Sequence, residues 1–286
     1  MSRELTHQVH EDEVHDHDRG LTFDLSTLMS RRRALQLFAV GGLTTLVGCG
    51  ASSCNSPGTT SSASGSDSTS STTTAAGSYT SVIPEETAGP YPGDGSNGVN
   101  VLTQSGIVRS DITASFGSSS ARAAGVPVAI ELTILDVAAG GTPLKDAAVY
   151  LWHCDRDGRY SLYSAEIADE NYLRGVQASG ADCKVVFTSI FPGAYSGRWP
   201  HIHFEVYPTL AEATAAGGKL VTSQIALPQD ACTRVYATHG YEQSVQNLAQ
   251  SSLATDNVFS DGYSTQLGTA SGSPAKGMRI ALNVGV

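Results

Sequence analysis

The sequence predicts an all-β domain, an antiparallel β-sandwich with long loops and little helix. Between residues 81 and 286, several short runs rich in β-branched and aromatic residues are each bounded by Gly, Pro or Asp. Such runs, separated by turn-forming residues, are typical of strands that pack as two sheets. Apolar spacing with a helical period is scarce in the same part of the chain. The two observations together indicate the sandwich.

The expected strands follow one another along this part of the chain. They are residues 126–135, 147–153, 184–190, 201–207, 221–227 and 278–284. Two further stretches, 209–216 and 242–251, are expected to form one or two helical turns each. Because the strands are short and turn residues separate them, we expect the chain to reverse direction repeatedly.

The first 80 residues contain no stretch that could form a packed core, and they divide into two parts. Residues 1–48 are predicted to be a signal peptide of the twin-arginine type, in which Arg31 and Arg32 precede an apolar stretch that stops at Val47. This stretch is several residues shorter than the roughly 20 needed to span a bilayer. Residues 49–80 consist mostly of Ser, Thr, Gly and Ala, which predicts a flexible tether ahead of the domain at 81–286.

Cys49 ends the signal in the sequence Leu46-Val47-Gly48-Cys49, which resembles a lipobox. In that interpretation the cysteine is lipidated, and the chain is exported by the twin-arginine route. The domain is then expected to stand at a membrane, on the cell surface or in the periplasm, through its N-terminal lipid anchor. The alternatives are an Ala-x-Ala-like cleavage site or a chance cysteine.

Charge and cysteine content exclude one class of partner and leave the disulfides open. The formal net charge of −10 and the lack of a basic stripe argue against a nucleic-acid partner. The remaining cysteines are an even set that allows two disulfides or none: Cys54, Cys154, Cys183 and Cys232. No oligomeric state is predicted.

Residues 192–204 concentrate side chains that can bind a metal. They read Pro-Gly-Ala-Tyr-Ser-Gly-Arg-Trp-Pro-His-Ile-His-Phe and lead into an expected strand. Because side chains two apart share one face of a strand, His201 and His203 can bind one ion while Ile202 points into the core. Tyr195 adds a phenol to the same segment. A His-x-His pair alone is more often a surface pair, so the interpretation depends on what accompanies it.

Tyr160 offers a second phenol, in the turn that follows the Trp-containing strand at 147–153. Both stretches resemble the intradiol ring-cleavage dioxygenases of the protocatechuate and catechol dioxygenase superfamily, and in particular its secreted, lipoprotein-type members. In that family one ligand tyrosine follows a Gly-x after such a strand, and the other precedes a His-x-His. An arginine stands three residues before the first ligand histidine, as Arg198 does here, and a Ser-Gln begins a later strand, as at 223–224. Further similar stretches are 86–91, 172–177 and 256–259.

The resemblance implies a non-haem Fe(III) dioxygenase with one iron per chain. The implied ligands are Tyr160, Tyr195, His201 and His203. The implied reaction inserts both atoms of O2 into a catechol-type aromatic diol and opens the ring by the intradiol (ortho) route to a muconate-type diacid. Phenolates are hard anionic donors that favour Fe(III), and neutral imidazole is a general ligand of first-row metals, so this donor set suits a ferric resting state.

The resemblance also assigns roles beyond metal binding. Tyr195 is implied to leave the metal and accept a substrate proton, and Arg198 to stabilise negative charge as the ring reacts. Gln224 is implied to hold the substrate or the oxygen species. Tyr91 and Arg174 are expected to line the substrate pocket.

Two other interpretations of the same residues are retained. The sandwich could be a cell-surface binding module that has lost turnover, although the intact set of four ligands with Arg198 and Gln224 argues against this. The same site could instead hold zinc or copper. Colour distinguishes these cases, because phenolate-to-Fe(III) charge transfer makes such proteins red and a zinc site is colourless.

Overall fold

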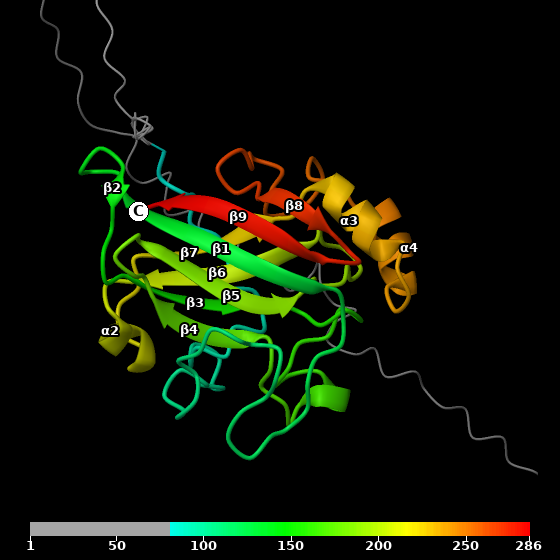
Figure 1. Cartoon of the computed structure of the whole chain (residues 1–286), viewed down its shortest axis with the longest axis horizontal. Helices are drawn as coiled ribbons and strands as arrows, with labels where there is room; N and C mark the ends of the chain where they lie inside the picture. The colour runs from blue at the N-terminus through cyan, green and yellow to red at the C-terminus, as the bar shows by residue number, and fades with distance from the viewer. Residues whose placement is uncertain (1–80) are drawn as a thin grey trace, which may run out of the picture.

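The computed structural model describes residues 81–286, which form two β-sheets packed against each other with few helices (Figure 1). The first sheet consists, in order, of β2 (Thr142–Pro143), β1 (Pro127–Asp136), β9 (Gly277–Gly285) and β8 (Thr269–Ser273), with β5 (Lys184–Ile190) also paired to β1. The second consists, in order, of β4 (Arg174–Ala178), β3 (Ala148–Trp152), β6 (His201–Tyr207) and β7 (Val221–Ala226). The predicted β-sandwich with little helix is confirmed.

The expected strands all occur, and the structure corrects one feature of their pairing. Each of the six lies within two residues of its predicted bounds, whereas β2, β4 and β8 were not predicted. The sheets are not wholly antiparallel, because β1 and β9 pair in parallel from Val128–Met278 to Leu135–Gly285. Alternation along a strand indicates which face is buried but not which way the neighbouring strand runs.

Within residues 81–286, α-helices occur at two expected places and one unexpected place. The stretches 209–216 and 242–251 contain α2 (Leu210–Thr214) and α4 (Glu242–Ala249). The unpredicted α3 (Gln229–Tyr236) buries one face, and a short 3-10 turn, η2 (Ala165–Ile167), lies in the long connection before β4. Within residues 81–286, no helix is long and apolar enough to cross a membrane.

The main core lies between the two sheets, and β6 shows how it is built. Ile202, Phe204 and Val206 alternate along this strand and belong to the core cluster. The histidines and Glu205 between them face the other side of the sheet, yet every residue of β6 is buried. The outer face of the second sheet is therefore also covered.

The cover on that face begins with residues 84–94, called here the covering segment. It crosses the sheet from β7 to β4. Pro84 O accepts a hydrogen bond from Ser223 on β7 at 2.8 Å, and Pro92 O accepts one from Tyr150 on β3 at 2.6 Å. Farther along the chain, Val101, Leu102 and Ile107 form a second cluster with Tyr150 and Trp152. Side chains on this face are thus enclosed without joining the main core.

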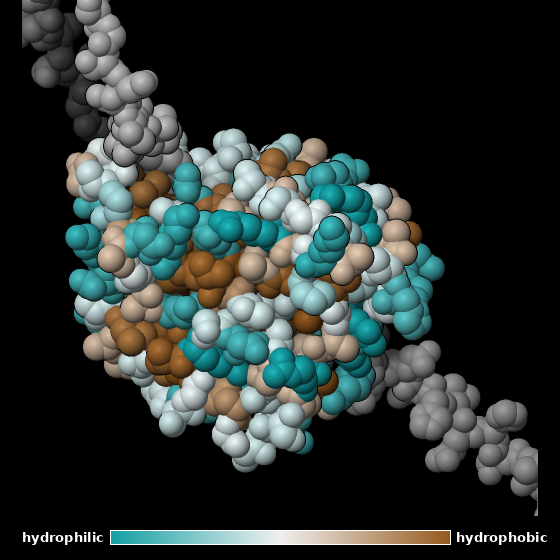
Figure 2. Space-filling view, viewed as in Figure 1, coloured by the Kyte–Doolittle hydropathy of each residue, from teal (hydrophilic) through white to brown (hydrophobic). Residues whose placement is uncertain are grey.

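The first sheet has an exposed outer face, on which hydrophilic and hydrophobic residues are interleaved (Figure 2). There Glu131 on β1 is paired with both Lys184 on β5 and Arg279 on β9. At one edge of the domain, Ile83 N donates to Gly285 O at 3.0 Å, so the described part begins beside the C-terminal strand. The predicted signal, lipidation site Cys49, tether and Cys54 all lie outside the described residues and stay predictions.

Candidate metal centre

Strand β6 places two imidazoles on the covered face of the second sheet. His201 and His203 are both buried, and their Nε2 atoms lie 3.1 Å apart. His203 pairs across the sheet with Trp152 of β3, and the two rings stack with centroids 4.8 Å apart and planes 7° apart. The stack holds the His203 ring in place from one side, while the covering segment approaches it at Gly89, where an added Cβ would lie 3.5 Å from His203 Cε1.

Two loops bring the tyrosines to this face, and a glycine in each loop allows them to approach. Gly158 has a φ of +84°, and a Cβ there would lie 2.9 Å from Tyr195 Cβ. Gly193 donates its N–H to Asp155 O at 3.0 Å, and a Cβ at Gly193 would lie 2.3 Å from Arg156 O. These contacts explain physically why one tyrosine follows a Gly-x and the other follows a Pro-Gly.

The structure brings all four predicted ligands together. Tyr195 Oη lies 3.1 Å from His201 Nε2 and 3.5 Å from Tyr160 Oη. Atoms bound to one first-row ion at about 2.1 Å lie roughly 3 to 3.5 Å from each other. The separations of these oxygen and nitrogen atoms therefore match those of ligands that share one ion.

A hydrogen bond to the backbone determines the tautomer of His201. His201 Nδ1 lies 2.6 Å from Trp199 O, and a carbonyl can only accept, so Nδ1 carries the proton and Nε2 carries a lone pair. His203 Nδ1 is buried and has no hydrogen-bond partner among the described residues, so its ring is held by stacking instead. Burial lowers the pKa of both histidines well below the usual value, and the charge of Arg198 lowers it further, which keeps them neutral.

The two tyrosines differ in exposure and in how firmly they are held. Tyr160 is buried, whereas Tyr195 is partly exposed. Burial raises the pKa of Tyr160 well above its usual value, and nearby Tyr195 and Cys154 raise it further, while Arg198 opposes the shift. A buried phenol becomes a phenolate only beside a strong positive charge, which a bound metal ion provides.

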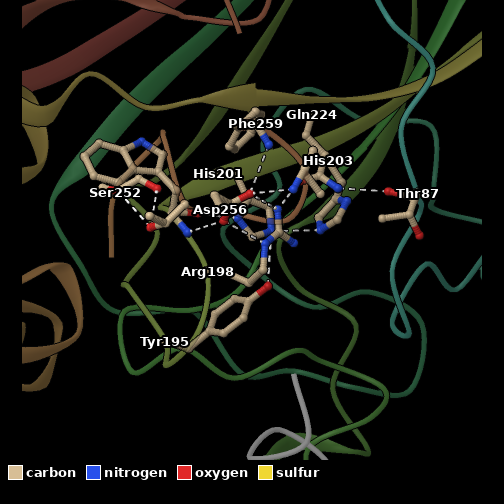
Figure 3. A network of polar contacts seen from close by, with 12 residues as sticks. Thr87, Tyr195, Arg198, His201, His203, Gln224, Ser252, Asp256 and Phe259 are labelled. Carbon is tan, nitrogen blue, oxygen red and sulfur yellow. Dashed lines mark hydrogen bonds and ion pairs between the residues drawn. The ribbon is translucent and has the colours of Figure 1, made fainter. Parts of the chain in front are cut away.

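Arg198 lies beside the histidines in a fixed network (Figure 3). Its Nε donates to Asp256 Oδ2 at 3.0 Å, and its Nη2 donates to Gln224 Oε1 at 2.7 Å. Gln224 Nε2 in turn donates to Thr87 O of the covering segment at 2.9 Å, which fixes the orientation of the amide. The family resemblance includes the stretch 256–259 but implies no role for Asp256. In the structure, Asp256 is the partner of Arg198.

The two expected pocket residues lie in different surroundings. The ring of Tyr91 lies 5.0 Å from the ring of Tyr160, at the candidate metal centre. Arg174 is buried, and its five N–H groups all have partners within the protein. No guanidinium donor of Arg174 therefore remains for a substrate group, and its expected place in the lining of the substrate pocket stays a prediction.

The other histidines and cysteines of residues 81–286 make their contacts outside the cluster of four candidate ligand atoms. His153 contacts Ser189 and the Cys154 carbonyl in the interior, and the His239 side chain is 99% exposed. Within residues 81–286, Cys154, Cys183 and Cys232 are free and buried. In the same range no three His, Cys, Asp or Glu side chains form a group that could hold a metal, so the two phenols are essential to the candidate set.

Comparison with known proteins agrees with this arrangement. Residues 109–234 match the dioxygenase family model Dioxygenase_C. The fold matches that of an intradiol ring-cleavage dioxygenase from Tetranychus urticae with a TM-score of 0.57 and 24% identity, over 72% of this chain and 94% of that one. The described domain therefore has the fold of an intradiol ring-cleavage dioxygenase. A second dioxygenase crystal structure matches with a TM-score of 0.53 and 22% identity, over 72% and 94% of the two chains.

A curated protein similar to this chain is the chlorocatechol 1,2-dioxygenase of Rhodococcus opacus, which is 28% identical over 120 residues, 33% of this chain. The chain spans 44% of that relative's length. The family match contains the four candidate ligands with Arg198 and Gln224. It excludes the covering segment and Asp256, so these parts of the site are known here from the geometry alone.

Proposed function

We propose that the domain is a non-haem Fe(III) dioxygenase that inserts both atoms of O2 into a catechol-type diol and opens the ring by the intradiol route to a muconate-type diacid. One observation carries the proposal most directly. Two phenol oxygens and two imidazole nitrogens lie within 3.1 to 3.5 Å of their neighbours in one buried cluster. Two anionic oxygen donors with two neutral nitrogen donors suit a ferric ion.

Tyr160, Tyr195, His201 and His203 are the residues that would hold the ion. When bound, the ion supplies Lewis acidity that makes the diol hydroxyls acidic and the ring reactive toward O2. His201 is prepared for this by the hydrogen bond from Nδ1 to Trp199 O, which directs the Nε2 lone pair into the cluster.

Tyr195 suits the role of proton acceptor better than Tyr160. It is the more exposed of the two, and its Oη lies 3.1 Å from His201 Nε2. Tyr160 is buried, with its backbone N–H bound to Ser164 Oγ at 3.0 Å. A phenolate at Tyr195 Oη can therefore accept a proton from a substrate hydroxyl while Tyr160 stays in place.

Arg198 and Gln224 are arranged to act on charge in the site. The charge of Arg198 already lowers the pKa values of His201 and His203, so its field reaches the cluster. Because Asp256 and Gln224 hold the guanidinium in place, it can stabilise negative charge on a reacting ring without first reorienting.

Isotope labelling and metal analysis test the proposal. The purified protein should contain close to one iron per chain, absorb in the visible range and convert catechol under ¹⁸O2 to a diacid that carries two ¹⁸O atoms. Bound zinc or copper, without the visible absorption of an Fe(III) phenolate, would support the alternative that the same residues hold one of those metals. A catechol-induced spectral shift with no O2 uptake would support the binding module.

We further propose that the domain is exported and anchored at a membrane by a lipid on Cys49. The twin-arginine pattern and the lipobox-like sequence support this. Replacement of Cys49 by Ser should release the protein from the membrane fraction, and a variant that still partitions through a lipid would contradict the anchor.

A further inference from the structure

The covering segment is held to the sheet at several points along its length. At its start, Glu86 N donates to Thr222 O at 2.7 Å, and at its end Asp94 Oδ2 pairs with Lys219 at 3.3 Å. Between these points the segment passes the candidate metal centre: a Cβ at Gly89 would lie 3.5 Å from His203 Cε1, and the Tyr91 ring lies 5.0 Å from the Tyr160 ring. The position of the segment therefore affects the walls of the site.

Arg174 of β4 joins this segment to the loop at 160–164, called here the Tyr160 loop. Nη1 and Nη2 donate to Pro92 O at 2.8 Å and to Tyr91 O at 2.9 Å. Nε and Nη2 donate to Ser161 Oγ at 3.1 Å and to Ser161 O at 2.9 Å. The fifth N–H, on Nη1, donates to Tyr150 Oη at 3.1 Å. One side chain thus hydrogen-bonds residues adjacent to a candidate ligand and residues of the segment opposite it.

The chemistry of these contacts points to a geometric role. All five acceptors are neutral oxygen atoms, and the side chain is 1% exposed. Burial of a cation costs desolvation free energy, which neutral hydrogen-bond acceptors offset less well than a carboxylate would. An apolar side chain of similar volume could fill the same space without that cost. The planar guanidinium does offer five donors in fixed directions, which no other side chain provides.

We infer that Arg174 is a positioning residue that fixes the covering segment and the Tyr160 loop to each other, and so sets where the rings of Tyr91 and Tyr160 lie. The inference rests on the proposed function for its effect on catalysis, but the structural coupling does not depend on a metal. Tyr163 makes one further link, since its Oη accepts from Gly93 N at 2.8 Å and its ring lies 5.4 Å from the Arg174 guanidinium.

Hydrogen exchange of the metal-free protein tests the coupling separately from activity. Arg174→Lys keeps the positive charge but loses the planar guanidinium with its five donors. Backbone amides in peptides spanning 84–94 and 160–164 should therefore both exchange at least tenfold faster than in the parent. Tyr163→Phe removes two neutral hydrogen bonds, one from Gly93 N and one to Asn97 Oδ1, and should give a smaller change at the same peptides. Exchange that is unaltered in Arg174→Lys, or altered in only one of the two segments, would overturn the inference.

Arg109→Lys is the matched control. This guanidinium also donates to backbone carbonyls, those of Ala114, Asn171 and Arg174, but its hydrogen bonds reach neither segment. Exchange in the two segments should therefore stay within about threefold of the parent. If Arg109→Lys accelerates hydrogen exchange in both segments as much as Arg174→Lys does, the effect is a general loss of local stability, and the specific role of Arg174 is refuted.

The iron-loaded protein gives the second readout. A shift of roughly 1 Å in a positioned group costs about 10²-fold in rate. Arg174→Lys should move the visible phenolate band and lower kcat roughly 10- to 100-fold, with a smaller change in KM. A parent-like band and kcat, together with faster exchange, would refute the link between this coupling and the position of Tyr160. Absence of turnover in the parent would refute the proposed function and leave the exchange result standing.

Discussion

The guanidinium of Arg198 and the carboxylate of Asp256 form a buried ion pair, with Nε and Oδ2 3.0 Å apart and side-chain exposures of 3% and 0%. Asp256 also accepts hydrogen bonds from the backbone N–H groups of Trp199 at 2.7 Å and Val258 at 2.9 Å. The carboxylate therefore fixes the arginine and the chain beside the candidate ligands at once.

Removal of this carboxylate should be strongly destabilising. Asp256→Ala leaves Arg198 buried without its counter-charge, so the free energy of unfolding in urea should fall by about 3–5 kcal/mol. Asp256→Asn keeps an acceptor and should fall between this variant and the parent. Asp157 is the control, since it pairs with Arg159 at the surface, and Asp157→Ala should cost no more than about 1 kcal/mol. Equal effects of the two alanine variants would contradict the structural role of the buried pair.

Tyr160 and Tyr163 offer a matched test of the candidate ligand set. Their rings lie 5.0 and 5.2 Å from the ring of Tyr91, but only Tyr160 Oη belongs to the donor cluster. Tyr160→Phe removes an anionic ligand that water replaces poorly, so most of the bound iron and the visible band should be lost. Tyr163→Phe should retain both. Metal analysis and absorption spectra decide the matter, and full iron occupancy in Tyr160→Phe would refute its assignment as a ligand.

Arg198 should affect the reaction and not the metal. Arg198→Lys keeps a positive charge near Asp256 but cannot reproduce the oriented bonds to both Asp256 and Gln224. Iron content and the catechol-induced spectral shift should be retained, while kcat falls roughly 10²-fold, the effect of losing one oriented charge-stabilising donor. Arg159→Lys, which alters a partly exposed guanidinium paired with Asp155 and Asp157, should leave kcat unchanged. Loss of iron from Arg198→Lys would contradict the proposed division of roles.

Sequence patterns predicted the fold class and the six main strands because alternation and turn residues are local signals. Strand β6 is an example, because the spacing of His201 and His203 alone places both side chains on one face of a strand. The parallel pairing of β1 with β9 depends on contacts between distant segments and leaves no local signal. The same limit explains Arg174, whose acceptors Tyr91 O and Pro92 O are 83 and 82 positions away in the sequence.

His153 lies between the sheets and links them near the candidate site. Its Nδ1 lies 2.7 Å from Cys154 O and therefore carries a proton, so Nε2 accepts from Ser189 Oγ at 2.7 Å. Burial is the main cause that lowers the pKa of His153 from 6.5 to about 4, and the hydrogen bond to Cys154 O opposes the shift. The imidazole is thus neutral in the folded protein at neutral pH.

The stability that depends on this histidine should decline as the pH falls. Below pH 6.5 the unfolded chain takes up a proton at His153 that the folded protein does not bind until about pH 4, so the free energy of unfolding decreases through this window. Between pH 7 and pH 5 the loss should be about 2 kcal/mol. His153→Gln lacks the titrating group but keeps a donor and an acceptor. From pH 7 to pH 5, its free energy of unfolding in urea should therefore decrease by about 2 kcal/mol less than that of the parent. Since both proteins retain His201 and His203, the difference between their pH profiles isolates His153, and parallel profiles would contradict its depressed pKa.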